Sequence, residues 1–246
     1  MKTVAVIPSR YESSRFAGKP LAPICGKPMI QHVYEAAMRA RVIDQVVVAT
    51  DDARIVQAVE DFGGRVLMTD TRHRSGTDRT LEAARQLGRS GRDIVINVQG
   101  DQPLMDPRCL DQVAAPLLDE PDLVMSTLAF EIVDPEEYTG AKDVKVVLDR
   151  QSNALYFSRA PIPYDRDGSA AFKSYKHLGI YAYRFDFLEI FSALPTGRLE
   201  DLEKLEQLRA LEFGHPIRVV VTSFDSPEVD LPDDIARIEA LIGSSR

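Results

Sequence analysis

Residues 3–20 read TVAVIPSRYESSRFAGKP, an apolar run that leads directly into a cationic loop. The run from Thr3 to Ile7 is typical of a strand buried on both faces. The loop carries Arg10, Arg15 and Lys19 together with serine hydroxyls and a glycine. Arginine offers a planar fork to phosphate oxygens and lysine a point charge, while backbone N–H groups fill the gaps between them. The stretch therefore predicts a polyphosphate site at the end of a first buried strand, with a solvated surface loop as the alternative.

Apolar runs and helix-period segments alternate through the first half of the chain. The expected strands are residues 4–7, 45–50, 65–68 and 94–98, and the expected helices are residues 29–40, 52–62 and 77–87. This α/β order predicts a three-layer sandwich on a mostly parallel, Rossmann-like sheet, with helices on both faces. Ligands bind beyond the carboxyl ends of such strands, so loops 8–20, 50–54 and 99–106 are expected at one edge.

The second half is less regular. The expected strands are residues 123–133, 144–148, 155–157, 177–183 and 217–222, and the expected helices are residues 186–194, 202–213 and 232–242. Antiparallel pairing of 144–148 with 155–157 predicts an additional small β-containing lobe. Since no repeat or clear linker interrupts the chain, we expect residues 1–246 to form a single domain.

Composition excludes several classes of protein. The 246 residues carry a formal charge of −8, which argues against nucleic acid as a partner. No apolar run approaches the roughly 18 residues of a membrane span, and we expect no signal peptide. Cys25 and Cys109 fit no metal or disulfide spacing, so both are expected to be reduced and cytosolic. With only four histidines, a metal would sit on carboxylates and phosphates, which suits Mg²⁺.

Two carboxylates are candidate metal ligands. Asp101 lies in Asn97-Val-Gln-Gly-Asp-Gln-Pro103, directly after a buried strand, and Asp230 follows the last strand. Each has a structural alternative, because Asp101 can cap the next turn and Asp230 can cap the helix that starts near Pro232. Two carboxylates and a cationic loop at one sheet edge make a stronger prediction than any of them alone.

A third motif precedes a helix. Residues 73–79 read HRSGTDR, in which Ser75 and Thr77 are plausible cap residues. The functional interpretation is that residues 75–77 present backbone to a base or ribose, with Arg74 or Arg79 nearby.

Seven motifs in order cover nearly the whole chain. They are PSR to KP at 8–20, HxSGTDR at 73–79, NVQGDxP at 97–103, ALYFSR at 154–159, HLGIY at 177–181, LEQLR at 205–209 and VDxP at 229–232. Together they resemble the motifs of the CMP-Kdo synthetases, the 3-deoxy-manno-octulosonate (Kdo) cytidylyltransferase family. The resemblance implies a cytoplasmic, Mg²⁺-dependent, homodimeric enzyme of nucleotidyltransferase fold. Such an enzyme activates the acidic C8 sugar Kdo with CTP for lipopolysaccharide assembly.

The resemblance also implies residue roles. Nucleotide would bind mainly to residues 1–120, and sugar binding and dimerisation would belong mainly to residues 121–246. The residues that would contact CTP are Arg10, Ser13, Arg15, Lys19, Arg74, Ser75 and Gly76. The residues that would line the sugar site are Arg159, His177, Tyr181, Glu206 and Gln207. Mg²⁺ would bind Asp101 and Asp230, and these two with Arg10 and Lys19 would carry the catalysis.

The chemistry that is implied suits these residue types. The anomeric hydroxyl of Kdo attacks the α-phosphorus of CTP and diphosphate leaves, which requires charge neutralisation and positioning without a covalent intermediate. Two of the sugar residues have structural alternatives. His177 lies in an apolar strand and suits a hydrogen-bonded core histidine, and Arg159 suits a buried pairing with a carboxylate.

Other functions remain open at this point. The same chemistry can act on the 8-amino analogue of Kdo or on sialic acid. A nucleotide-binding regulator without catalysis is a different class, and the presence of both Asp101 and Asp230 argues against it. An NAD-binding protein has a similar sheet order, but no G-x-G-x-x-G follows Ile7.

Overall fold

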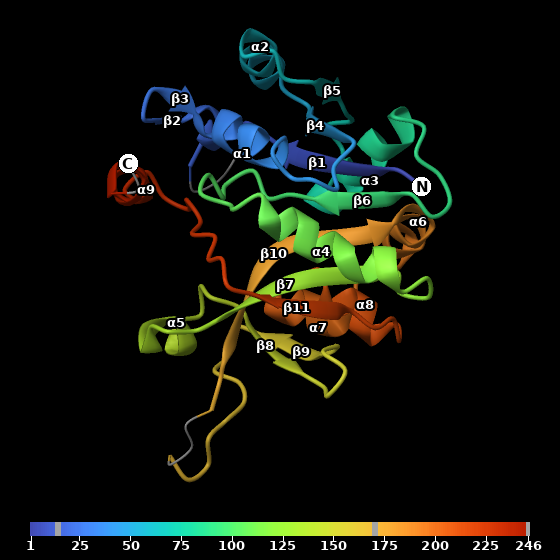
Figure 1. Cartoon of the computed structure of the whole chain (residues 1–246), viewed down its shortest axis with the longest axis vertical. Helices are drawn as coiled ribbons and strands as arrows, with labels where there is room; N and C mark the ends of the chain where they lie inside the picture. Colours follow the sequence, from blue (N-terminus) through green and yellow to red (C-terminus); the bar gives the residue numbers. More distant parts are fainter. Residues whose placement is uncertain (13–15, 169–171, 245–246) are drawn as a thin grey trace.

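A central sheet organises the molecule, which is a computed structural model that describes residues 1–12, 16–168 and 172–244. The strand order is β11-β7-β10-β6-β1-β4-β5 (Figure 1). The strands are β1 Thr3–Ser9, β4 Gln45–Thr50, β5 Val66–Met68, β6 Ile94–Asn97, β7 Met125–Glu131, β10 Tyr175–Arg184 and β11 Arg218–Thr222. Only β10 runs antiparallel to its neighbours in this path. The predicted mostly parallel α/β sheet is therefore confirmed.

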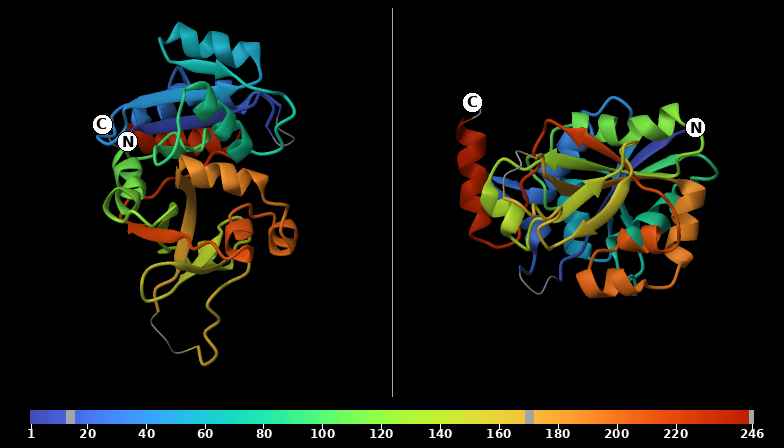
Figure 2. Two further views of the ribbon diagram at one scale, coloured as in Figure 1. Left: turned by 90° about the vertical axis from the view of Figure 1, so that its right-hand side faces the viewer. Right: turned by 90° about the horizontal axis from the view of Figure 1, so that it is seen from below.

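Helices cover both faces of the sheet (Figure 2). One face packs against α1 Met29–Ala37, α2 Ala53–Asp61 and α4 Arg108–Asp119. The other packs against α3 Gly76–Gln86, α6 Phe185–Ala193 and α8 Leu208–Glu212, and α7 Arg198–Glu203 contacts α8. Strand β1 shows why two cores form, because Ala5 and Ile7 join the first core while Val4 and Val6 join the second. Successive side chains of a strand point to opposite faces.

A smaller lobe extends from one end of the sheet, at the bottom of Figure 1. Its strands β8 Lys145–Leu148 and β9 Ala154–Ser158 pair antiparallel, and β8 also pairs with the start of β10. The short helix α5 Pro135–Thr139 precedes β8. This arrangement agrees with the antiparallel pairing that the sequence predicts.

The remaining elements lie near the first loop. They are the 3-10 helix η1 Lys19–Leu21, the strands β2 Pro23–Ile24 and β3 Lys27–Pro28, and the C-terminal helix α9 Asp234–Ser244. Figure 1 shows α9 beside the β2-β3 hairpin, and the backbone N–H of Cys25 donates to Glu239 Oε1 at 2.7 Å. The C-terminal segment thus returns to the edge of the sheet from which the loop after β1 leaves.

One predicted helix is wrong. Residues 202–213 cover the end of α7, a turn and α8, because Lys204 adopts a left-handed conformation with φ 54° and its N–H donates to Glu200 O, which ends α7. Glu206 and Gln207 therefore lie in the turn before α8 and not on one continuous helix. The sequence prediction contains no element that corresponds to helix α4, which includes Pro116, a residue that usually disrupts a helix.

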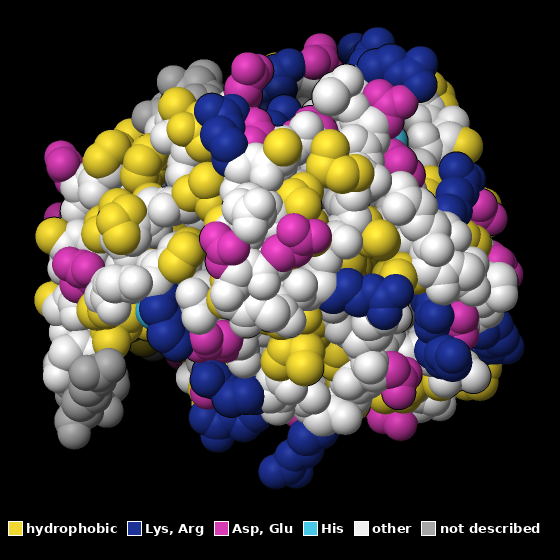
Figure 3. All heavy atoms as spheres, turned by 90° about the horizontal axis from the view of Figure 1, so that it is seen from above, with side chains coloured by type: hydrophobic (Ala, Val, Ile, Leu, Met, Phe, Trp, Pro, Cys, Tyr) yellow, Lys and Arg dark blue, Asp and Glu magenta, His cyan; other side chains and the backbone are white. Residues whose placement is uncertain are grey.

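The surface mixes charge types. Figure 3 shows Lys and Arg side chains interspersed with acidic and hydrophobic ones on the face seen from the side of α2. In the part of the chain that the structure describes, no helix has the length and hydropathy needed to cross a bilayer.

We expect the stability of the fold to be most sensitive to substitutions in the central strands. Ile96 in β6 is fully buried in the first core, whereas Leu202 in α7 is 79% exposed. Because Ile96→Ala removes buried methyl groups and leaves a cavity, we expect a loss of roughly 2–5 kcal/mol in the free energy of unfolding. Urea unfolding measures it, and Leu202→Ala is the control, with an expected change of about 0.5 kcal/mol or less. Equal losses in the two variants would contradict this description of the core.

Candidate active site

The loops that follow β1 and β6 leave the same edge of the sheet. The two strands are parallel neighbours, with Val6 in register with Asn97. Gly100 permits the close approach of the loops, because a Cβ at this position would lie 3.2 Å from Ser9 Oγ. Across this junction, Lys19 Nζ lies 2.5 Å from Asp101 Oδ2. The first cationic loop and the first candidate carboxylate are therefore in direct contact.

A smaller cavity of about 260 Å³ opens between these loops and the start of α3. It is lined by four of the residues that the sequence predicts to bind nucleotide: Arg10, Lys19, Ser75 and Gly76. Sequence reasoning missed Ser9, His73 and Gln99 as lining residues. Arg74 is exposed and does not line the cavity, and Ser13 and Arg15 lie outside the described residues.

The loop after β4 supports this cavity indirectly. Arg79 lines the cavity, is 4% exposed, and donates from NH2 to Asp51 Oδ2 at 2.6 Å. Ser75 Oγ accepts from the backbone N–H of Asp78 at 3.1 Å, so Ser75 is the N-cap of α3 as the structural alternative predicts. Capping and cavity lining coexist here, because the cap fixes the first turn of α3 against the cavity.

A larger cavity of about 1100 Å³ adjoins the smaller one and shares Gly76, Gln99 and Asp101 with it. It brings together the five residues predicted to bind sugar: Arg159, His177, Tyr181, Glu206 and Gln207. Asp230 also lines it. These residues come from four separate stretches of sequence, and their roles in binding stay predictions.

Three polar atoms among the residues that line the larger cavity are buried without hydrogen-bond partners among the described residues. They are Asn97 Oδ1, Glu206 Oε1 and Gln207 Nε2, although Glu206 Oε1 also lies 3.5 Å from Arg209 NH2 in a long ion pair. The other carboxylate oxygen of Glu206 accepts from Thr77 Oγ1 at 2.5 Å. Burial raises the pKa of Glu206. Because unpaired buried polar groups cost free energy, two acceptors and one donor in this position indicate a ligand rich in hydroxyl groups.

An aromatic wall flanks these atoms. His177 is 5.1 Å from both Phe157 and Tyr181, measured between ring centroids, and its Nε2 lies 2.8 Å from Thr127 Oγ1. Burial lowers the pKa of His177 to about 3. The imidazole is therefore neutral, and the alternative of a hydrogen-bonded core histidine holds together with a place in the cavity wall.

The two candidate metal ligands are brought together by backbone contacts. The N–H of Val229 donates to Asp101 O at 2.9 Å, and Lys19 Nζ reaches Val229 O at 3.0 Å. A third carboxylate that sequence reasoning missed, Glu228, lies beside them. Burial and the charges of Asp101 and Asp230 raise its pKa to about 7. An acidic residue two positions before Asp230 is the signal that could have indicated it.

The cations of the larger cavity have different partners. Lys176 pairs with Glu137 at 2.5 Å and with Asp225 at 3.0 Å. The guanidinium of Arg159 donates to two backbone carbonyls, Glu203 O at 2.9 Å and Ala141 O at 3.0 Å. These hydrogen bonds of Arg159 go to neutral carbonyls, whereas the alternative from the sequence was a carboxylate partner.

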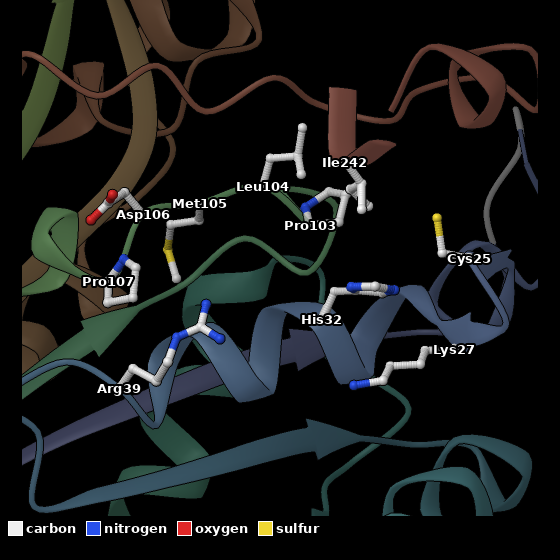
Figure 4. A pocket seen from close by; sticks show the side chains of 10 residues that line it. All are labelled: Cys25, Lys27, His32, Arg39, Pro103, Leu104, Met105, Asp106, Pro107 and Ile242. Carbon is white, nitrogen blue, oxygen red and sulfur yellow. The ribbon is translucent and has the colours of Figure 1, made fainter. Parts of the chain in front are cut away.

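A hollow of about 410 Å³ on another face lies between α1, residues 103–107 and Ile242 of α9 (Figure 4). Two of its polar side chains have partners within the chain, since His32 Nε2 lies 2.8 Å from Ile24 O and Lys27 pairs with Glu35. None of the predicted site residues lines it. We therefore assign the candidate active site to the two adjoining cavities.

Comparisons with known proteins agree with this geometry. The family model described as cytidylyltransferase matches residues 4–217. A 3-deoxy-manno-octulosonate cytidylyltransferase from Desulfatibacillum aliphaticivorans is 62% identical, over 98% of this chain and 99% of the relative. An 8-amino-3,8-dideoxy-manno-octulosonate cytidylyltransferase from Shewanella loihica is 56% identical, over 98% of each chain. A solved structure of CMP:2-keto-3-deoxy-manno-octonic acid synthetase complexed with CTP is 44% identical, with a TM-score of 0.93 and full coverage of both chains.

The half-buried imidazole of His177 predicts a pH dependence of stability. The pKa of His177 is about 3 in the folded protein against an ordinary value of 6.5, so the unfolded state binds more protons between these values. The free energy of unfolding therefore falls as the pH drops below about 6.5, by up to roughly 1.4 kcal/mol per pH unit. Urea unfolding between about pH 7 and about pH 4 measures this dependence. In His177→Gln we expect the free energy of unfolding to depend less steeply on pH, because the contribution of the imidazole is gone. An unchanged slope in the variant would contradict a neutral imidazole.

Proposed function

This chain belongs to the cytidylyltransferase family, and we propose that it transfers CMP from CTP to the anomeric hydroxyl of Kdo and releases diphosphate. The observation that carries the proposal is the pair of adjoining cavities. One holds cations at the start of α3, and the other contains unpaired polar atoms that suit a polyhydroxylated ligand. Relatives that share most of their length with this chain carry the name of that activity.

We place the reaction at the wall that the two cavities share. Gly76, Gln99 and Asp101 line both cavities, so a sugar hydroxyl in one and an α-phosphate in the other meet beside Asp101. The hydroxyl oxygen forms a bond to the α-phosphorus, the bond from that phosphorus to the bridging oxygen breaks, and diphosphate departs. Arg10 and Lys19 neutralise phosphate charge, and the proton of the hydroxyl passes to solvent.

Mg²⁺ is part of the proposal, and the residues present fit it. Asp101 and Asp230 supply two carboxylates whose main chains are joined through Val229. Among the described residues there is no group of three or more His, Cys, Asp or Glu side chains that could hold a metal ion. Mg²⁺ is commonly held by one or two carboxylates together with substrate phosphates, which matches this pair. When bound, it would supply positive charge to the phosphates of CTP.

The sugar would lie against the second cavity. Arg159 keeps part of its guanidinium available for the sugar carboxylate, because two of its donors reach backbone carbonyls and an arginine has five. Glu206 and Gln207 would bind hydroxyl groups through Oε1 and Nε2, the two atoms that lack hydrogen-bond partners. We further propose a cytoplasmic homodimer that acts in lipopolysaccharide assembly. Both cysteines are free, which suits a reducing compartment, and two-fold dimers are the commonest oligomers.

Asp101 gives the sharpest prediction about the reaction. Asp101→Asn keeps the shape of the side chain but removes its charge, so we expect the fold to persist and turnover to drop by about 10² or more. Diphosphate release with CTP, Kdo and Mg²⁺ measures turnover, and Mn²⁺ titration of the protein measures metal affinity, which should also weaken. Asp233→Asn, an exposed carboxylate outside the cavities, is the control. Normal Mg²⁺-dependent rates in Asp101→Asn would refute the assignment.

A competition experiment tests the identity of the sugar. With Kdo and its 8-amino analogue at equal concentration and limiting enzyme, the ratio of CMP products equals the ratio of the two specificity constants. We expect CMP-Kdo to predominate. An excess of the amino product would replace Kdo by its analogue and leave the reaction class intact. Sialic acid in a parallel assay covers the third sugar, and no diphosphate release with any of these sugars would favour a non-catalytic nucleotide-binding regulator.

A further inference from the structure

Lys142 reaches across the larger cavity to a candidate metal ligand. It lies between α5 and β8 in the small lobe, whereas Asp230 belongs to the C-terminal segment. Its Nζ is 3.7 Å from Asp230 Oδ2, beyond hydrogen-bond distance, and its side chain is 52% exposed against 14% for Asp230. Its charge opposes the rise in the pKa of Glu228 and contributes to the lowered pKa of Asp234, so Lys142 lies near three carboxylates.

The backbone around Lys142 is held in place from both sides. The buried Lys145 donates from Nζ to Gly140 O and to Asp143 O, each at 2.6 Å. Arg159 donates to the carbonyl of Ala141, the residue that directly precedes Lys142. Since the main chain is fixed, any exchange of partners by Lys142 needs only rotation of its flexible side chain.

The other cations that line this cavity are held more closely. Lys176 has two carboxylate partners within 3.0 Å, and Arg237 donates to Glu228 O at 3.0 Å and lies 3.4 Å from Asp234. Arg159 is tied to two carbonyls. By contrast, the pair of Lys142 with Asp230 is long and partly exposed, and ion pairs of that kind contribute little and exchange readily.

We propose that Lys142 is a substrate-binding cation with two successive partners. In the protein without ligands it balances the charge of Asp230. When a divalent cation binds Asp230, the ammonium group is repelled, and it turns into the cavity beside Arg159 to pair with the carboxylate of the sugar acid. Lys142 thus competes with the metal and then strengthens sugar binding. This inference rests on the proposed function, its first step on the metal site proposed there and its second step on the sugar.

Two variants and one control test the proposal. Lys142→Met removes the charge and keeps most of the stem, and Lys142→Arg keeps the charge. Lys173→Met is the matched control, because Lys173 forms an exposed pair with Glu131 at 2.7 Å and does not line the cavity. The first measurement is Mn²⁺ titration of the full chain without nucleotide or sugar, with free Mn²⁺ followed by electron paramagnetic resonance. The second is KM for Kdo and for CTP at saturating Mg²⁺.

Loss of the Lys142 charge should change the two measured constants in opposite directions, with a lower Kd for Mn²⁺ and a higher KM for Kdo. In Lys142→Met we expect Mn²⁺ to bind about three- to tenfold more tightly, because its competitor is gone. We expect KM for Kdo to rise about tenfold while KM for CTP changes little, which corresponds to one lost charge-assisted contact. Lys142→Arg and Lys173→Met should resemble the wild type in both readings.

Either reading can overturn the proposal. Unchanged Mn²⁺ affinity in Lys142→Met rules out competition at Asp230, and an unchanged KM for Kdo rules out the contact with the sugar. If the wild type releases no diphosphate with CTP and Kdo, the proposed function fails and the sugar contact fails with it. The Mn²⁺ titration, which needs neither substrate, then decides the pairing of Lys142 with Asp230 independently.

Discussion

The ammonium group of Lys19 joins three segments that are far apart in sequence. It leaves the 3-10 helix after β1, contacts Asp101 after β6, and reaches the carbonyl of Val229 in the C-terminal segment. Both cavities meet at this point, since Asp101 lines each of them. The parallel arrangement of β1 and β6 places the first two segments at one edge, and the third is held there by the Val229 to Asp101 hydrogen bond. This junction fixes Asp101 in the wall that the two cavities share.

Excess negative charge at this junction explains the position of the lysines. Asp101, Glu228 and Asp230 lie close enough that two of them raise the pKa of the third. Lys19 pairs tightly with Asp101 at 2.5 Å, and Lys142 pairs loosely with Asp230 at 3.7 Å. Like charges in a partly buried site repel, so counter-charges are needed whether or not ligand is present. The tight pair shapes the site, and the loose pair can be exchanged for metal and substrate.

The sequence predicts the sheet well because the strands are buried on both faces. Gln45–Thr50 is an unbroken apolar stretch apart from its ends, and its predicted bounds match β4. The prediction of helices is less accurate where local sequence gives no clear signal. Helix α4 contains Pro116, and a left-handed residue, Lys204, separates α7 from α8. The residues of the two cavities could be predicted from sequence motifs that lie far apart along the chain. Contacts between distant segments, such as that of Lys142 with Asp230, leave no periodic pattern and appear only in three dimensions.

The larger cavity contains two kinds of binding group, charged side chains and buried neutral ones. Its charged groups lie near the rim and around Asp230, whereas Asn97 and Gln207 are nearly fully buried and neutral, and His177 is held neutral by burial. Charged rim groups attract an acidic ligand but discriminate weakly, because solvent screens them and lysine side chains adapt. Buried atoms without partners discriminate strongly, because a ligand that lacks the matching hydroxyl leaves them unpaired. Selection among acidic sugars should therefore depend on the hydroxyl pattern that meets Asn97, Glu206 and Gln207 more than on net charge.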